Sequence, residues 1–157
     1  MNEKYALGVD IGGSHIACQV VELGSSRPVG ETYTEVKIAE NESAQKILAA
    51  WDSALGACMQ KAGARAITGL GVAMPSPFDF IKGIAMAEHK FASIKGMNVR
   101  AELHRLTGID PSRILFTNDA AGFGMGAWSL GGGNARHLIG VTLGTGFGAC
   151  FIVDGCY

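Results

Sequence analysis

The sequence has no cluster of basic residues and no long hydrophobic run. Its 157 residues carry 13 Lys and Arg against 14 Asp and Glu, which gives a formal net charge of −1. Nucleic-acid grooves and anionic membrane surfaces both attract clustered Lys and Arg, so this balance argues against either as a main partner. The apolar runs are a handful of residues long, whereas a membrane-spanning helix needs about 20. Residues 1–4 lead directly into a strand, with no positively charged leader. We therefore predict a cytoplasmic location, with neither nucleic acid nor membrane as partner.

Several familiar motifs are also missing. The four cysteines show no Cys-x-x-Cys spacing, which predicts free thiols in a reducing compartment and no zinc site. The four histidines show no ligand spacing, and there is neither a Walker A lysine loop nor a Gly-x-Ser-x-Gly elbow. Residues 144–149 are similar to the dinucleotide fingerprint, but a β-rich stretch follows them where a helix would have to receive the pyrophosphate. We therefore reject a dinucleotide-binding domain.

The strongest signal that is present is a repeat of the opening segment near the end of the chain. Residues 7–23 (LGVDIGGSHIACQVVEL) align without a gap with residues 139–155 (IGVTLGTGFGACFIVDG), at a constant offset of 132 positions. Six pairs are identical, among them Val9 with Val141 and Cys18 with Cys150. Each copy predicts an apolar strand, a glycine-rich turn with a hydroxyl residue and a second strand. A period this long indicates two related domains rather than a solenoid.

Two matched turns of this kind favour a site that holds phosphate from two sides. Glycine lets the backbone approach an anion closely, and consecutive N–H groups form a concave donor cluster. Either turn alone is as readily explained as a tight turn without a ligand. The second copy, and the acid that precedes the first turn, favour phosphate binding. The predicted phosphate residues are Asp10, Gly12, Gly13, Ser14, Gly144, Thr145 and Gly146.

The order of the remaining elements predicts an α/β fold of the ribonuclease-H-like type, with a mixed five-stranded sheet flanked by helices. We expect a first helix that is capped by Asn41 or Ser43 and runs to about residue 62, and a second that is capped by Asn98 and stops at Gly108. A third helix is expected over residues 120–130, where three glycines (122, 124 and 126) weaken the helix locally and permit close packing. The strands are expected at residues 5–11, 15–23, 29–36, 66–74 and 113–117.

Polar residues follow three of these strands at their carboxyl ends, the edge where ligands bind in open parallel sheets. They are Asp10, the segment Pro75-Ser76-Pro77 and the pair Asn118-Asp119. Asp119 is the predicted chemical centre, although an Asn-Asp pair at a helix start is also a common cap. Asp10 is either a turn-forming acid or a partner, through water, of Mg²⁺ held on phosphates. His89 is either part of the substrate pocket or a surface residue.

Taken together, four of these motifs resemble the ROK family of sugar kinases and repressors, within the actin and hexokinase superfamily. Residues 10–14 (DIGGS) resemble its first phosphate motif, and residues 71–79 (GVAMPSPFD) resemble its Pro-Gly-Pro sugar-side segment. Residues 118–121 (NDAA) resemble its Asn-Asp-Ala-Asn catalytic motif, and residues 143–146 (LGTG) its second phosphate motif. The resemblance covers nearly the whole chain, but only the N-terminal part of such a protein.

The resemblance implies ATP-dependent phosphorylation of a hexose or N-acetylhexosamine, with an actin-like ATPase fold. Asp119 would be the general base and Asn118 would hold a neighbouring hydroxyl, with Pro75, Ser76 and His89 on the sugar side. The two glycine turns and Asp10 would position the ATP phosphates and Mg²⁺. His15, Ser76, Thr117 and Ala121 depart from the family's usual residues, which leaves the identity of the sugar open. The family's zinc motif has no counterpart in these residues, so the resemblance would place a structural zinc only in the missing second domain.

We expect two parts, an N-terminal sugar kinase domain over residues 1–132 and the first hairpin of a second domain over residues 133–157. On that division, we expect the 157-residue chain alone to have little or no kinase activity. One alternative is a sugar-sensing repressor of the same family, which we disfavour because the segment before Asp10 leaves no room for a DNA-binding motif. The other alternative is a non-catalytic association module. An unpaired hairpin exposes strand edges, so a homodimer is a further expectation.

Overall fold

The computed structural model describes residues 4–88, 91–131, 133–143 and 147–157. Its main sheet has the order β3-β2-β1-β5-β8, with β4 also paired to β2. β1 runs antiparallel to β2 and parallel to β5, and β5 runs parallel to β8, so the predicted mixed sheet is confirmed, although it has six strands and not five. The strands are β1 (Tyr5–Ile11), β2 (His15–Glu22), β3 (Arg27–Pro28), β4 (Thr34–Lys37), β5 (Ile67–Met74) and β8 (Ile114–Asn118).

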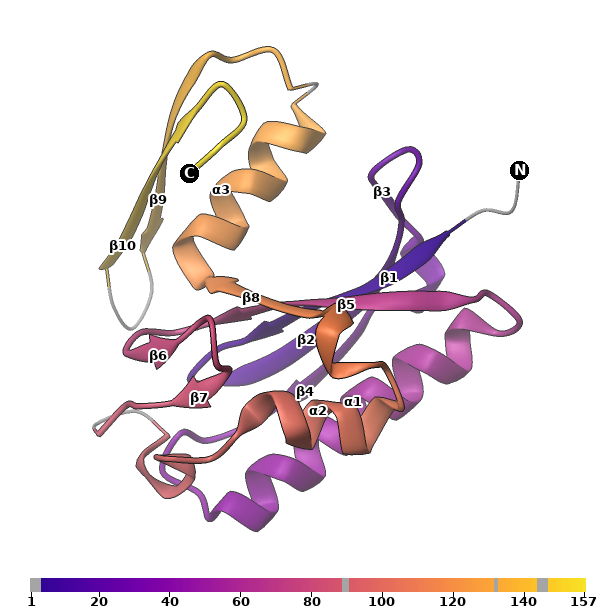
Figure 1. Cartoon of the computed structure of the whole chain (residues 1–157), viewed down its shortest axis with the longest axis vertical. Coiled ribbons are helices and arrows are strands. Elements are labelled where there is room, and N and C mark those ends of the chain that lie inside the picture. Colours follow the sequence, from indigo (N-terminus) through magenta and orange to yellow (C-terminus); the bar gives the residue numbers. More distant parts are fainter. Residues whose placement is uncertain (1–3, 89–90, 132, 144–146) are drawn as a thin grey trace.

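Helices flank this sheet on both sides, as predicted (Figure 1). α1 (Ala44–Ala62) and α2 (Val99–Thr107) cover one face, and α3 (Asp119–Leu130) rises from the other. Ser43 caps α1 by accepting from the Lys46 amide, and Asn98 caps α2 in the same way through the Ala101 amide. None of the helices in the described part of the chain is long and apolar enough to cross a membrane.

The core lies between α1 and the sheet because both contribute an apolar face at their own period. On β1, Leu7 and Val9 alternate inward with at most 5% exposure. On α1, Ile47, Trp51 and Leu55 recur at helical spacing and are fully buried. Interdigitation of these two faces fixes the position of the β1–β2 hairpin.

One predicted element differs from the structure. Residues 29–36 were expected to form one strand, but the chain forms β3, a 3-10 turn (Gly30–Thr32) and then β4. The turn is held by Thr32, whose buried hydroxyl donates to the Val29 carbonyl and accepts from the Val20 amide. This buried side-chain bond replaces strand pairing, which the β-rich composition did not reveal. The segment that follows β5 contains a short hairpin of β6 (Phe78–Asp79) and β7 (Ile84–Ala85).

The C-terminal hairpin, β9 (His137–Leu143) and β10 (Phe147–Val153), forms a sheet of its own against α3. Two glycines allow this close packing: a Cβ at Gly124 would lie 2.2 Å from the Cys150 Sγ, and one at Gly140 2.7 Å from it. Close packing was predicted for all three α3 glycines, and it is confirmed for Gly122 and Gly124. It is wrong for Gly126, which has open space around it.

The two copies of the repeat pair their strands differently. In the first hairpin Val9 lies opposite Cys18, so the repeat would place Val141 opposite Cys150. Val141 instead lies opposite Ala149, a difference of one residue. Because side chains alternate along a strand, this difference exchanges the two faces of β10 relative to β9.

Candidate active site

The carboxyl ends of β1, β5 and β8 meet at one edge of the sheet. Asp10 lies opposite Ala73 near the end of β5, and Met74 lies opposite Asn118 at the end of β8. The parallel direction of these strands therefore delivers Asp10, the segment after Met74 and the start of α3 to the same place.

A cleft of about 620 Å³ opens at this edge. Eight of the predicted site residues line it, namely Asp10, Gly12, Gly13, Ser14, Pro75, Ser76, Asn118 and Asp119. The remaining predicted residues, His89, Gly144, Thr145 and Gly146, lie outside the described residues. Leu143 and Phe147, which flank the second glycine turn, line the same cleft.

Asn118 caps α3, whereas Asp119 lies at the surface of the cleft. Asn118 is the N-cap of α3, because its Oδ1 accepts from the Ala120 amide at 3.0 Å and from the Ala121 amide at 3.4 Å. Its Nδ2 donates to the Ser76 Oγ at 3.3 Å, which links β8 to the segment after β5. Asp119 is the first residue of α3 and is exposed to the cleft, where one oxygen accepts from the Ala120 amide at 2.9 Å. The helix start therefore orients the Asp119 carboxylate, and capping by Asn118 leaves it at the cleft surface.

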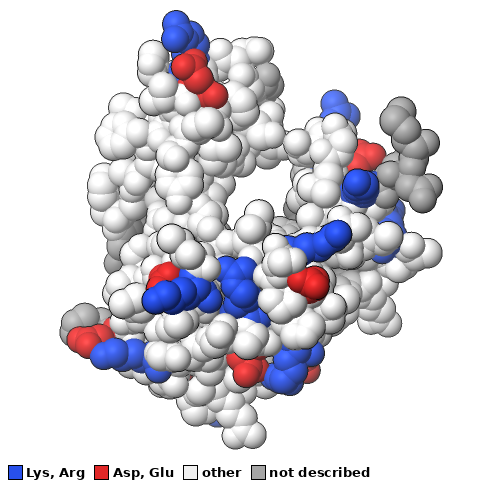
Figure 2. Space-filling view, in the orientation of Figure 1, with Lys and Arg blue, Asp and Glu red and all other residues white. Residues whose placement is uncertain are grey.

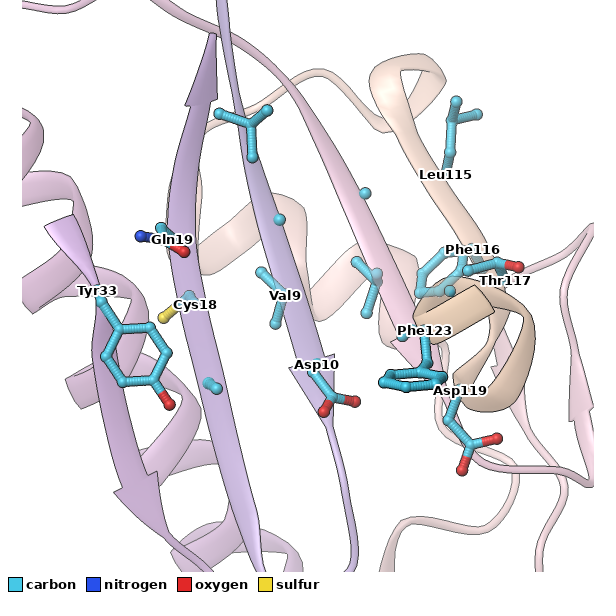
Figure 3. Close-up of a pocket in the computed structure, with 17 residues that line it drawn as sticks. Val9, Asp10, Cys18, Gln19, Tyr33, Leu115, Phe116, Thr117, Asp119 and Phe123 are labelled. Atoms are coloured by element: carbon cyan, nitrogen blue, oxygen red, sulfur yellow. The ribbon is translucent and has the colours of Figure 1, made fainter. Parts of the chain in front are cut away.

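The charged groups at the cleft include two carboxylates, those of Asp10 and Asp119. Burial raises the pKa of Asp10, and the Asp119 carboxylate raises it further, while His15 opposes the shift. The His15 Nε2 lies 3.8 Å from Asp10 Oδ2, and the Ser14 hydroxyl lies 3.2 Å from His15 Nδ1. Figure 3 shows the Asp10 and Asp119 carboxylates at the same end of the sheet, with the Phe123 ring beside them. A cation between or near them would relieve their repulsion.

The first glycine turn is shaped by its neighbours. The Gly12 amide donates to the His15 carbonyl at 2.9 Å, which closes the turn between β1 and β2. A Cβ at Gly13 would lie 2.6 Å from a carboxylate oxygen of Glu40, so the flexible end of that side chain would have to move to admit a larger residue. Glycine at both positions leaves the backbone open to the cleft, and the phosphate role of this turn stays a prediction.

The carboxylates at the cleft edge are groups that could hold Mg²⁺. In the part of the chain that the structure describes, no three His, Cys, Asp or Glu side chains gather in a metal-binding group. Magnesium commonly binds one or two carboxylates together with substrate phosphates and water. Asp10, with a second carboxylate near it, fits that mode.

Sequence reasoning missed several residues that line the cleft. Phe123 lies one helical turn after Asp119, a spacing that could have identified it. Thr142 also lines the cleft, and it occupies the position of Asp10 in the second copy of the repeat. Gly148 and Ala149 also line the cleft. Their place there depends on the one-residue shift in the pairing of β10, which the sequence does not indicate.

A shallow apolar groove of about 510 Å³ continues from the cleft across the sheet (Figure 3). Asp10, Asp119 and Phe123 border both hollows. The floor of the groove consists of small residues on three strands, and Tyr33 and Leu115 stand at its sides. Leu115 is 68% exposed there, so this face of the sheet is only partly covered by α3.

Comparison with known proteins gives the following matches. A family model described as the ROK family matches residues 6–157. No curated protein matches the sequence. Among solved structures, the inorganic polyphosphate/ATP-glucomannokinase from Arthrobacter sp. strain KM is similar at a TM-score of 0.75 and 23% identity, over 98% of this chain and 60% of that one.

A ROK family glucokinase from Streptomyces griseus, solved in complex with glucose and AMPPNP, is similar at a TM-score of 0.71 and 22% identity, over 96% of this chain and 45% of that one. A ROK family transcriptional regulator, a homolog of the E. coli MLC protein, is similar at a TM-score of 0.70 and 18% identity, over 98% of this chain and 37% of that one. At these identities the likeness concerns the fold. The chain spans about half the length of such structures.

Proposed function

Because the chain belongs to the ROK family, as its four motifs predicted, we propose that it is the N-terminal portion of an ATP-dependent sugar kinase. The observation that carries the proposal is the shared cleft: the first glycine turn, Asp10 and Asp119 line one hollow at the carboxyl edge of the sheet. In this proposal the glycine turn binds the phosphates and Asp119 serves as the base, in a cleft whose volume of about 620 Å³ admits a sugar and a phosphate chain.

Asp119 acts as the general base in this proposal. It removes the proton from a sugar hydroxyl as that oxygen attacks the terminal phosphorus of ATP, and the bond from that phosphorus to the bridging oxygen of ADP breaks. Asn118 and Ser76, joined at 3.3 Å, hold a neighbouring hydroxyl of a hexose or N-acetylhexosamine. Phosphoryl transfer depends mostly on positioning and charge neutralisation, so a carboxylate held by a helix start meets the requirement.

The amides and hydroxyl of residues 12–14 bind the phosphates in this proposal, and Gly144, Thr145 and Gly146 keep the phosphate-binding role that the sequence predicts for them. When bound, Mg²⁺ supplies positive charge to the phosphates. Asp10 would hold this ion through water. The positive charge of the ion would also offset the repulsion from Asp119, which raises the pKa of Asp10.

We retain the division into a kinase domain over residues 1–132 and the opening hairpin of a second domain over residues 133–157 as part of the proposal. The chain spans 45% of the Streptomyces griseus glucokinase. Phosphoryl transfer needs both sides of the cleft, so we expect the 157-residue chain alone to bind ligands weakly and to transfer little or no phosphate.

Titration of the isotope-labelled chain tests the proposal by NMR. Mg·AMPPNP is expected to shift the amide signals of Gly12, Gly13 and Ser14, and glucose or N-acetylmannosamine those of Asn118 and Ala120. Asp119→Asn is expected to remove the sugar response and to keep nucleotide affinity within about twofold, because its carboxylate meets the hydroxyl and not the phosphates. Asp52→Asn, an exposed change on α1, is the matched control.

Two outcomes would contradict the proposal. One is the lack of any response of residues 12–14 to the nucleotide. The other is an unchanged sugar response in Asp119→Asn. Rapid ADP formation by the chain with a sugar would instead overturn the expectation that the isolated chain is inactive.

A sugar sensor in the same cleft is the second candidate, because the ROK transcriptional regulator shares the fold at a TM-score of 0.70. The accessible carboxylate of Asp119 favours the kinase, since a sensor needs hydrogen bonds to the sugar and no base. A chain that binds sugar but no Mg·AMPPNP would favour the sensor.

A further inference from the structure

The guanidinium group of Arg100 holds three separate segments of the chain together. Arg100 is the second residue of α2 and is half-buried. Its Nη1 donates to the Pro111 carbonyl at 3.0 Å and to the carbonyl of Ile114, where β8 begins. Its Nη2 donates at 2.8 Å to the Ile81 carbonyl, in the turn between β6 and β7. Arg100 therefore joins the β6–β7 hairpin to the start of β8.

Neighbouring basic side chains pair with acids, whereas Arg100 does not. Lys82 lies 3.9 Å from Asp79. Arg105 lies 2.9 Å from Glu102. Figure 2 shows blue and red atoms close together in the lower part of the molecule, where the β6–β7 hairpin and α2 lie in Figure 1. Within the described residues Arg100 makes no ion pair, and its guanidinium donates to main-chain carbonyls instead. Its planar set of five donors suits contacts with several segments, which the single ammonium group of lysine could not reproduce.

Aromatic rings continue the contact from Arg100 to the cleft. The Arg100 guanidinium lies 5.0 Å from the centre of the Phe116 ring, a cation–π contact. The Phe116 ring in turn lies 5.0 Å from the ring of the buried Phe78. Phe116 is on β8, two residues before Asn118, and Phe78 opens β6, two residues after Ser76. The packing of these rings therefore helps to set the separation of the two cleft residues.

Glycine at position 83 allows the β6–β7 hairpin to approach α2 and β8 closely. A Cβ at Gly83 would lie 2.9 Å from both the Arg100 Cβ and the Phe116 ring. The Gly83 carbonyl accepts from the Val99 amide at 2.8 Å, at the start of α2. The hairpin is thus held from both sides, by main-chain bonds to α2 and by the Arg100 side chain to β8.

We propose that Arg100 is a positioning residue for the sugar side of the cleft. It holds the β6–β7 hairpin, and with it Ser76, where the Asn118 Nδ2 can donate to the Ser76 Oγ at 3.3 Å. Ser76 and Asn118 line the cleft, and Arg100 lies outside its lining. This role rests on the proposed function, in which those two residues hold a hydroxyl of the sugar, and it extends sugar binding to a residue of α2.

The side-chain amide signals of Asn118 report its bond to Ser76 in the absence of any ligand. In NMR spectra of Arg100→Ala, these signals are expected to shift towards their positions in Ser76→Ala, which lacks the acceptor. Guanidinium chloride at a low, non-denaturing concentration should move them back, because the ion can bind where the side chain was removed. Arg105→Ala, which removes an exposed arginine from the same helix, is the matched control and should leave the signals unchanged.

Sugar titration tests the consequence for binding. Arg100→Ala should bind glucose or N-acetylmannosamine about tenfold more weakly than the unmodified chain, because small displacements of positioning groups are costly. Its affinity for Mg·AMPPNP, read from the amide signals of residues 12–14, should stay within about twofold, because that turn is remote from the hairpin contacts. Arg100→Lys keeps the charge without the planar donors and should show the same split, which provides the test if Arg100→Ala does not fold.

Three outcomes would overturn the proposal. The first is that the Asn118 side-chain signals of the Arg100 variants match those of the unmodified chain. The second is an unchanged sugar affinity in these variants. The third is equal weakening of sugar and nucleotide binding, which indicates a general loss of structure. If the unmodified chain binds no sugar, the proposed function fails, and the Asn118 signals still decide whether Arg100 positions Ser76.

Discussion

The β1–β2 and β9–β10 hairpins share a sequence pattern but differ in almost everything that surrounds them. The first is the centre of a six-stranded sheet and lies under α1, whereas the second forms a two-stranded sheet with one face on α3. Leu7 is 1% exposed, and its repeat counterpart Ile139 is 66% exposed. The comparison shows that a local pattern determines the strands, while partners elsewhere in the chain determine which faces become core.

The largest expected effect comes from truncating the counterparts Leu7 and Ile139. Leu7→Ala should lower the free energy of unfolding by about 2–5 kcal/mol, because it leaves a cavity under α1. Ile139→Ala should lower it by less than about 0.5 kcal/mol, because its side chain already contacts water. Urea unfolding measures both. Similar costs at the two positions would show that the second hairpin is covered after all.

A smaller effect is expected where α3 supports the second hairpin. A Cβ at Gly124 would meet the Cys150 Sγ at 2.2 Å, so Gly124→Ala should loosen the hairpin at a cost of about 1–3 kcal/mol. Gly126→Ala has open space around it and should stabilise α3 by about 0.5–1 kcal/mol through helix propensity. Hydrogen exchange of the β9 and β10 amides separates the two: protection should fall in the first variant and not in the second. Unchanged protection in Gly124→Ala would mean that the hairpin does not depend on this contact.

The sequence predicted those parts of the fold that depend on local pattern. The apolar period of α1, the cap at Asn98 and the carboxyl ends of strands close to Asp10 and Asn118 all follow from neighbouring residues, and all are found in the structure. Of the two caps expected for α1, the structure uses Ser43. The cleft could be anticipated because parallel strands bring their carboxyl ends together. The functional roles assigned to its residues remain proposals.

What the sequence could not predict depends on contacts between distant residues. The 3-10 turn at Thr32 is held by a buried hydroxyl that bonds to Val20 on another element. The register of β10 is a second case, because both of its faces are apolar and neither pairing is favoured by pattern alone. The place of Phe123 in the cleft likewise depends on the angle at which α3 leaves the sheet.

The smallest effect concerns a position at which the two copies place different chemistry in the cleft, Asp10 in the first and Thr142 in the second. Burial and the charge of Asp119 raise the pKa of Asp10 above its ordinary value of 3.8, so the folded chain loses this proton at higher pH than the unfolded chain does. Ionisation of Asp10 therefore favours unfolding. This cost is absent below the ordinary pKa, appears as pH rises through the raised pKa and then stays constant.

Asp10→Asn should accordingly stabilise the ligand-free chain at neutral pH and lose that advantage in acid. Because 53% of the Asp10 side chain is exposed, solvent screening limits the gain to less than about 0.5 kcal/mol. Thermal unfolding at pH ~3 and pH ~7 measures the difference, with Thr142→Val as a control whose effect should not vary between those pH values. Asp10→Asn should also weaken Mg·AMPPNP binding, since it removes the carboxylate proposed to hold the metal. A variant that is destabilised at neutral pH, or equally stabilised at both, would show that Asp10 is not strained by its neighbours in the cleft. The asymmetry between the two copies would then have no electrostatic basis.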